Sequence, residues 1–255
     1  MLPSSATGSP LALQDGARIA VIGGGPSGSF FAIFALKMAR MIGRELQVTI
    51  FEPKDFTKDG PGGCNKCGGI ISELLVQTLA LEGIGLPDTV VRKGVNSYRL
   101  HSEEGEVTIA APGLERRIAS VYRGGGPKGA IPGAHESFDH FLLGQAVAEG
   151  ATHRKMRIDR VEIRNGLPVL FSNDEEVLTA ELLVGAFGLS STARVFENIG
   201  FGYHEPPSIT TAIAELKKVD QALATEFAYL ELKGDEAQRA ADISGAKEVA
   251  KWADQ

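Results

Sequence analysis

The chain has 255 residues, of which 43% are hydrophobic and 23% charged, so it is long and apolar enough to bury a substantial core. Its net charge of -6 and the lack of a lysine- or arginine-rich run argue against nucleic acid as a partner, because phosphate backbones are also negative. No stretch approaches the ~18 consecutive apolar residues of a membrane span.

The first 17 residues are rich in proline, serine and glycine. They lack the basic start and the long apolar stretch of a signal peptide, so we expect a flexible leader at residues 1–17 and a cytoplasmic protein.

Residues 18–52 predict a βαβ unit. Residues 18–22 are a β-rich apolar run, a glycine cluster follows, residues 27–41 are apolar almost all round like a buried helix, and residues 48–52 are a second apolar run. Two such runs joined by a helix are typical of parallel neighbours in a right-handed βαβ unit.

The next part of the chain predicts antiparallel structure. A loop rich in glycine and cysteine at residues 60–69 leads into a helix at residues 72–81. Apolar runs at residues 95–100 and 107–110 flank a Glu-Gly turn, which predicts a hairpin outside the parallel sheet.

A second glycine-rich loop, residues 123–133, precedes Ser137, a predicted N-cap for an amphipathic helix. This helix has one apolar stripe, formed by Phe138, Phe141, Leu142 and Ala146.

Asn165-Gly166 is a strong hairpin signal, because both residues tolerate positive φ. The turn lies between predicted strands at residues 157–164 and 167–171, and one more strand is predicted at residues 182–186. The elements together predict an α/β fold, in which a Rossmann-like βαβ domain is interleaved with an antiparallel sheet.

Gly23, Gly25 and Gly28 satisfy the pattern G-x-G-x-x-G, with Pro26 and Ser27 inside it, where a predicted strand meets a predicted helix. The first glycine permits a tight turn, the second lets a pyrophosphate approach the backbone, and the third lets the helix pack closely on the strand. Amides at the helix N-terminus would bind the phosphates.

Glu52 ends the second predicted strand, 24 residues after Gly28. A carboxylate near this spacing hydrogen-bonds a ribose diol and repels a 2′-phosphate, which favours FAD or NAD over NADP at this site. The alternative is a glycine-rich turn beside a surface glutamate, but strand, helix, second strand and acid follow one another in the order that nucleotide binding requires.

Two further motifs follow the fingerprint. Residues 62–70 read Gly-Gly-Cys-Asn-Lys-Cys-Gly-Gly-Ile, and residues 185–188 read Gly-Ala-Phe-Gly, followed by Ser190, Ser191 and Arg194. In this order the motifs resemble the geranylgeranyl reductase-like branch of the p-hydroxybenzoate-hydroxylase-type flavoproteins, over residues 18–216.

The resemblance implies FAD as the cofactor, with its adenosine end on the fingerprint and its flavin ring beside a substrate-domain sheet. Implied cofactor contacts are Lys54, Arg123, Gly188 and the backbone of residues 156–158, which includes Arg157. Cys67, Gly68 and Gly69 would lie near the flavin ring, and no side chain is assigned as a catalytic acid or base.

We accordingly place an FAD-binding domain at residues 18–94 and 111–200. A partial substrate-domain sheet is expected at residues 95–110 and 201–232, and a helical or loose tail at residues 233–255.

The chain departs from the family at two places. Phe187 stands where the family has an aspartate that orders the loop near the pyrophosphate, so use of NAD(P)H as electron donor is only one candidate. The family also continues into a second Gly-Asp motif, and Gly234-Asp235 lacks the strand-to-helix setting of that motif. We therefore expect the front part of a flavoprotein, which could hold FAD weakly or not at all.

Cys64 and Cys67 form a C-x-x-C pair. Two reduced thiols, a reversible disulfide near the flavin and half of a zinc site are the alternatives. A structural zinc needs four ligands and the chain has no second cysteine pair, so we expect no metal.

The resemblance favours an FAD-dependent oxidoreductase that transfers a hydride from reduced flavin to a small, unsaturated, apolar substrate of the prenyl type. A flavin monooxygenase of the same fold and a non-catalytic dinucleotide-binding remnant stay open. A prenyl substrate would also allow peripheral contact with the inner face of a membrane, by family analogy alone.

Overall fold

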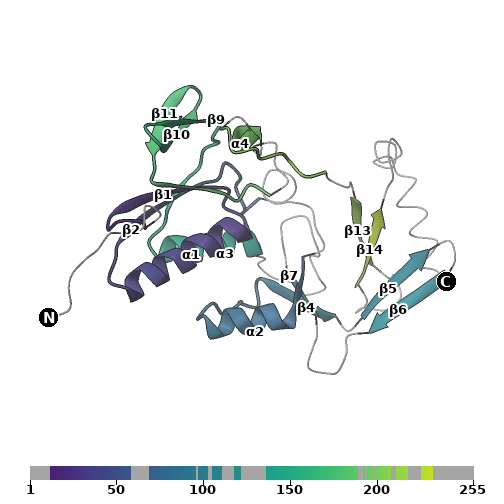
Figure 1. The fold of residues 1–255 in the computed structure, drawn as a ribbon. Helices are drawn as coiled ribbons and strands as arrows, with labels where there is room; N and C mark the ends of the chain where they lie inside the picture. The colour runs from purple at the N-terminus through teal and green to yellow at the C-terminus, as the bar shows by residue number, and fades with distance from the viewer. Residues whose placement is uncertain are drawn as a thin grey trace. The chain divides into compact units, whose positions relative to one another are not determined.

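The computed structural model describes residues 12–58, 69–95, 97–102, 105–110, 118–121, 136–188, 192, 194–197, 199–207, 211–217 and 225–231 (Figure 1). The chain divides into two compact units. The first comprises Met1–Pro53 and Leu142–Pro206, and the second comprises Lys54–Phe141 and Pro207–Gln255.

A parallel sheet organises the first unit. Its strand order is β12-β1-β2-β8, formed by Leu182–Gly185, Ala17–Ile22, Leu46–Phe51 and Thr152–Arg154. Helix α1 (Pro26–Met41) joins β1 to β2, which confirms the predicted βαβ unit. Helix α3 (Phe138–Ala148) precedes β8.

Side chains of β1 alternate between two covered faces of this sheet. Val21 lies against Gly28 of α1, whereas Ala20 and Ile22 join a buried cluster with Val161 and Leu170. The latter two belong to an antiparallel sheet of order β11-β10-β9, formed by Glu175–Thr179, Leu167–Ser172 and Arg160–Arg164. Figure 1 shows these layers: α1 and α3 on one side of β1 and β2, and β10 and β11 on the other.

Two tight turns connect the strands of this antiparallel sheet. Asn165 and Gly166 have φ of 52° and 79°, which confirms the predicted hairpin. The second turn, Asn173-Asp174, has φ of 50° and 64° and was not predicted. Strand β9 begins at Arg160, three residues later than predicted.

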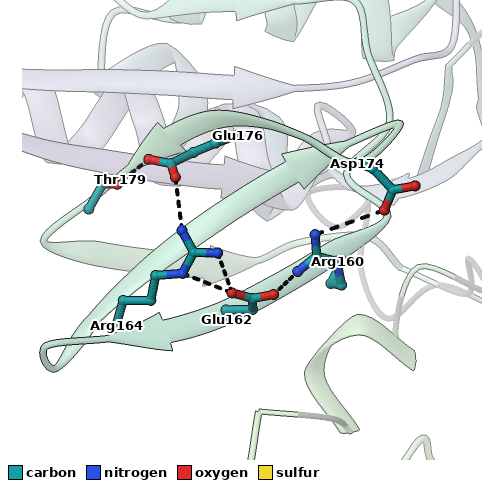
Figure 2. Close-up of polar contacts among 6 residues, drawn as sticks. All are labelled: Arg160, Glu162, Arg164, Asp174, Glu176 and Thr179. Carbon is teal, nitrogen blue, oxygen red and sulfur yellow. Dashed lines mark hydrogen bonds and ion pairs between the residues drawn. The ribbon is translucent and has the colours of Figure 1, made fainter.

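Ion pairs cover the outer side of this sheet (Figure 2). Arg164 contacts Glu162 at 2.6 Å and Glu176 at 3.1 Å, and Arg160 pairs with Glu162. The Arg160 guanidinium also lies 3.9 Å from the centroid of the Phe171 ring. Because the charged groups are exposed, each pair stabilises the fold by at most about 1 kcal/mol.

The second unit contains only antiparallel strand pairs within its described residues. Strands β3 (Ile70–Ser72), β7 (Ile118–Val121) and β4 (Val91–Val95) form a sheet of order β3-β7-β4. Helix α2 (Glu73–Leu81) follows β3 and confirms the predicted helix, with Ser72 Oγ accepting the Leu75 amide at 3.1 Å as an N-cap.

Two further strand pairs belong to the second unit. Strands β5 (Ser97–Ser102) and β6 (Gly105–Ala110) form the predicted hairpin, with β5 starting two residues later and β6 two residues earlier than expected. Strands β13 (Thr211–Lys217) and β14 (Thr225–Glu231) pair antiparallel. Within the described ranges no helix is long and apolar enough to span a membrane.

The compact units have different bounds from the predicted domains. Strands β3, β4 and β7 and helix α2 lie in the second unit, because these strands pair with one another and not with the parallel sheet. Part of the predicted leader is tied to the connection after α1, since Gly16 N donates to Glu45 O at 2.8 Å. The division into an FAD-binding and a substrate domain stays a prediction.

Ser137 does not have its predicted role as an N-cap. Helix α3 begins directly after it, as predicted, but its buried Oγ has no hydrogen-bond partner among the described residues, so the side chain does not cap the helix. Most of the first glycine-rich loop (residues 60–68), the whole second loop (residues 123–133) and the predicted tail (residues 233–255) lie outside the described residues.

Candidate functional site

The glycine-rich loop passes closely between two strands of the first unit. Gly23 has φ of 108°, and its amide donates to Phe51 O at 2.9 Å. A Cβ added to Gly23 would lie 2.3 Å from Ala186 O, which is far inside van der Waals contact. The first glycine of the fingerprint is therefore required by both backbone conformation and space.

Gly28 sets the distance between α1 and the loop. A Cβ at this position would lie 1.9 Å from Gly23 O, so only glycine allows this close packing. The neighbouring Ser29 is fully buried, and its Oγ donates to Gly24 O at 2.9 Å. Ser29 was not among the predicted site residues, although its place directly after the fingerprint was an available signal.

The start of α1 has the properties of an anion site. Gly25 is the N-cap and has no side chain to satisfy the helix amides, and the first turn has no acidic residue. Among the residues that the structure describes, the amides of Gly25, Ser27 and Gly28 donate to no protein acceptor. Such amides and the positive end of the helix dipole favour a phosphate. Pro26, at the first helical position, has no amide hydrogen to lose.

Glu52 follows β2 and lies beside this loop. Its side chain is buried, and Oε2 accepts the Gly24 amide at 2.9 Å. The Glu52 backbone is fixed by β8, because its amide donates to Arg154 O at 3.1 Å and His153 Nε2 donates to its carbonyl at 3.1 Å. The Glu52 carboxylate thus lies at the same loop as the amides that donate to no acceptor among the described residues. The role of His153 was missed, because β8 has only three residues and no sequence signal of its own.

Phe187, after β12, packs in an aromatic cluster. Its ring centroid lies 5.2 Å from that of Phe196, on α4 (Arg194–Glu197), and 6.4 Å from that of Tyr203. The ring covers Gly185, where a Cβ would lie 2.8 Å from Phe187 Cε1. Phe187 therefore contributes packing where the resembled family has a carboxylate. Gly188 next to it has φ of 59° and space around its Cα.

The other predicted contacts fall in different places. Arg157 lies after β8 in the first unit and pairs with Asp159 at 3.5 Å. Lys54 is the first residue of the second unit. Arg194 starts α4 with an exposed side chain. The structure therefore brings the fingerprint and Glu52 together, and their contact with a cofactor stays a prediction, as it does for Lys54 and Arg157.

Gly69 has a structural role in the second unit. It has φ of 61°, and a Cβ there would lie 1.9 Å from Val121 O, while Val121 N donates to Gly69 O at 2.6 Å. Gly69 must be glycine for β3 to approach β7, and this requirement holds whether or not the residue also contacts a cofactor. Cys64, Cys67, Gly68, Arg123, Ser190 and Ser191 lie outside the described residues. Within the described part, no three His, Cys, Asp or Glu side chains are grouped to hold a metal ion.

No protein-family model and no curated protein matches the chain. Among solved structures, the chain is similar to halogenase PltM, with 16% identity over 71% of this chain and 36% of that chain, and a TM-score of 0.45. It is also similar to the flavin-dependent brominase Bmp2, with 18% identity over 68% of this chain and 38% of that chain, and a TM-score of 0.46.

A third similar structure is that of the Diels-Alderase PyrE3, with 19% identity over 78% of this chain and 36% of that chain, and a TM-score of 0.48. PltM has also been solved in complex with phloroglucinol and FAD. The chain spans less than two fifths of the length of each of these three proteins, and similarity at this level assigns no activity to it.

Proposed function

We propose that the first unit binds the adenosine-diphosphate half of FAD and that the chain is part of a flavin-dependent oxidoreductase. The observation that carries the proposal is that three amides without an acceptor among the described residues, those of Gly25, Ser27 and Gly28, lie at the same loop as the buried Glu52 carboxylate. A dinucleotide needs both features, a cradle for phosphate and an acceptor for a ribose diol.

The amides of the loop and the Glu52 carboxylate would bind different parts of the dinucleotide. The three amides would hold the diphosphate, helped by the dipole of α1. Glu52 would accept hydrogen bonds from the adenosine ribose, and its charge would repel a 2′-phosphate. The Gly24 amide supports the Glu52 carboxylate at 2.9 Å, so the acceptor is positioned before the ligand arrives. When bound, a flavin supplies hydride transfer, and the protein supplies orientation and exclusion of water.

Our proposal for the reaction is based on the sequence resemblance and not on the geometry of this loop. We propose hydride transfer to an unsaturated, apolar substrate of the prenyl type, with reduced nicotinamide as one candidate electron donor. Peripheral contact with a membrane would be expected only if the substrate is of this prenyl type. A flavin monooxygenase is the second candidate, and turnover without oxygen by an artificial electron donor would favour the reductase over it.

The proposal is tested by the visible absorption spectrum of the chain after incubation with FAD and desalting, followed by a titration with FAD, NAD and NADP. We expect retained flavin bands, weaker binding of NAD and no binding of NADP. Glu52→Gln keeps the size of the side chain but removes the charge and one acceptor oxygen, so FAD should bind about ten-fold more weakly.

The matched control is Glu175→Gln, which makes the same change at an exposed position of β11 and should leave FAD binding unchanged. A folded chain that binds no dinucleotide, or that binds FAD equally well with and without the Glu52 carboxylate, contradicts the proposal. The first of these results would favour the non-catalytic remnant.

A further inference from the structure

The first unit has an apolar pocket that is separate from the glycine-rich loop. Its volume is about 580 Å³, within the ~300–1,000 Å³ range of small-molecule sites. Residues before β1, on α1, after α1 and on β12 line it, among them Leu13, Phe30, Phe31, Phe34, Ile42 and Leu182. No fingerprint glycine and no part of Glu52 is in the lining.

Helix α1 contributes a second apolar stripe to this pocket. Its sheet-facing stripe is already used, because Ala32, Ile33 and Leu36 are buried. Phe30 and Phe34 stack at 6.4 Å between ring centroids, and the next residue of this stripe, Met38, is 65% exposed. A helix that packs on a sheet needs one apolar stripe, so the second indicates a ligand or a partner.

Among the described residues that line the pocket, Arg44 is the one with a charged side chain. Its backbone is fixed by the end of α1, where Gly43 has φ of 67° and Arg44 N donates to Ala39 O at 2.9 Å. One guanidinium nitrogen donates to Leu13 O. Among the described residues Arg44 has no ion pair, and the nearby Asp15 uses Oδ1 to accept the Glu45 amide at 2.6 Å.

We propose that this pocket binds a free, single-chain amphiphile with an anionic head, such as a medium-chain carboxylate. The tail lies along Phe30, Phe34 and Met38, and the head pairs with Arg44. Arginine suits this role because its planar donors match a carboxylate and one of them is already oriented by Leu13. The apolar stripe gives most of the affinity, and Arg44 gives the preference for an anion.

Equilibrium dialysis of the full chain against radiolabelled dodecanoate, below the concentration at which it forms micelles, tests the proposal. Dodecanol serves as the neutral probe of equal chain length. We expect saturable binding at one site, with dodecanoate bound about five-fold more tightly than dodecanol, as an exposed charged hydrogen bond predicts. Arg44→Gln should remove this preference, whereas the matched control Arg164→Gln on β9 should keep it.

Ala35→Phe fills the pocket from its α1 side and should weaken binding of both probes by about ten-fold or more, with an unchanged circular dichroism spectrum. Equal binding of the two probes, or unchanged binding by Arg44→Gln, would overturn the proposal. So would a dimer in sedimentation that binds neither probe, because a second copy would then cover the stripe. None of these results depends on whether the chain binds FAD.

Discussion

At the scale of single residues, two glycines of the loop are fixed by contacts between backbones. Gly23 lies against Ala186 O and Gly28 lies against Gly23 O, so a side chain at either position would meet an atom that cannot rotate away. Flexible neighbours could adjust to an added methyl group, but a strand end and a helix start cannot do so without moving the loop. The amides that we assign to phosphate binding are part of the same loop.

Gly28→Ala separates helix propensity from packing. Alanine is favoured over glycine inside a helix by about 1 kcal/mol, but overpacking against a backbone atom costs about 1–3 kcal/mol, and the 1.9 Å contact is at the severe end. We expect a net loss of about 1–2 kcal/mol in the free energy of unfolding in urea, together with weaker FAD binding. Gly144→Ala in α3 is the control, because nothing lies within 4 Å of the added Cβ. The control should stabilise by about 0.5–1 kcal/mol. Equal stabilisation by both changes would contradict this account.

At the scale of elements, local signals were sufficient for some features and not for others. Asn165-Gly166 predicted its hairpin because glycine makes the turn type explicit, whereas Asn173-Asp174 adopts the same positive φ angles without a glycine. Strands β3 and β8 have three residues each and pair with distant segments, so no periodicity could reveal them. At the candidate site, spacing predicted Glu52 beside the loop but not the support from His153, because that contact depends on the place of β8.

The pairing of β1 with β12 yields a prediction on pH. Arg18, in β1, donates to both carboxylate oxygens of Glu181, directly before β12, and this hydrogen bonding lowers the pKa of Glu181 below its ordinary value of 4.5. A lowered folded-state pKa stabilises the fold above the unfolded-state value, and the stabilisation disappears as the pH falls through the folded-state pKa.

We therefore expect Glu181→Gln to lower the free energy of unfolding by about 0.5 kcal/mol at pH 7, a value kept small because the pair is over one third exposed. The difference from the unchanged chain should shrink as the pH falls below about 4.5, because the unfolded carboxyl then takes up a proton while the folded carboxyl stays ionised, which favours unfolding of the unchanged chain. Urea unfolding at pH 7, 5 and 3.5 measures this difference in the free energy of unfolding, with Glu175→Gln as a control at an exposed position. A difference that stays constant with pH would mean that the carboxylate charge contributes nothing.

At the scale of the whole molecule, the division into two units predicts which part of the chain a bound nucleotide stabilises. All the residues that we assign to the diphosphate and the ribose lie in Met1–Pro53, within the first unit. ADP carries these two groups without the flavin, so it tests the fingerprint separately from any role of the second unit. A ligand at 100 times its Kd stabilises the state that binds it by about 2.7 kcal/mol, enough to slow hydrogen exchange of the amides in that unit about 100-fold.

Hydrogen exchange followed by mass spectrometry, with and without ADP, should thus show slower exchange in β1, α1, β2 and β8. Exchange in β5–β6 and β13–β14 of the second unit should stay unchanged, because a unit with its own contacts can open without releasing the nucleotide. AMP, which lacks the second phosphate, is the matched ligand and should protect less at equal concentration. Slower exchange in both units alike would show that they open together as one cooperative structure. Unchanged exchange everywhere, at ADP concentrations up to the millimolar range, would contradict nucleotide binding by the loop itself.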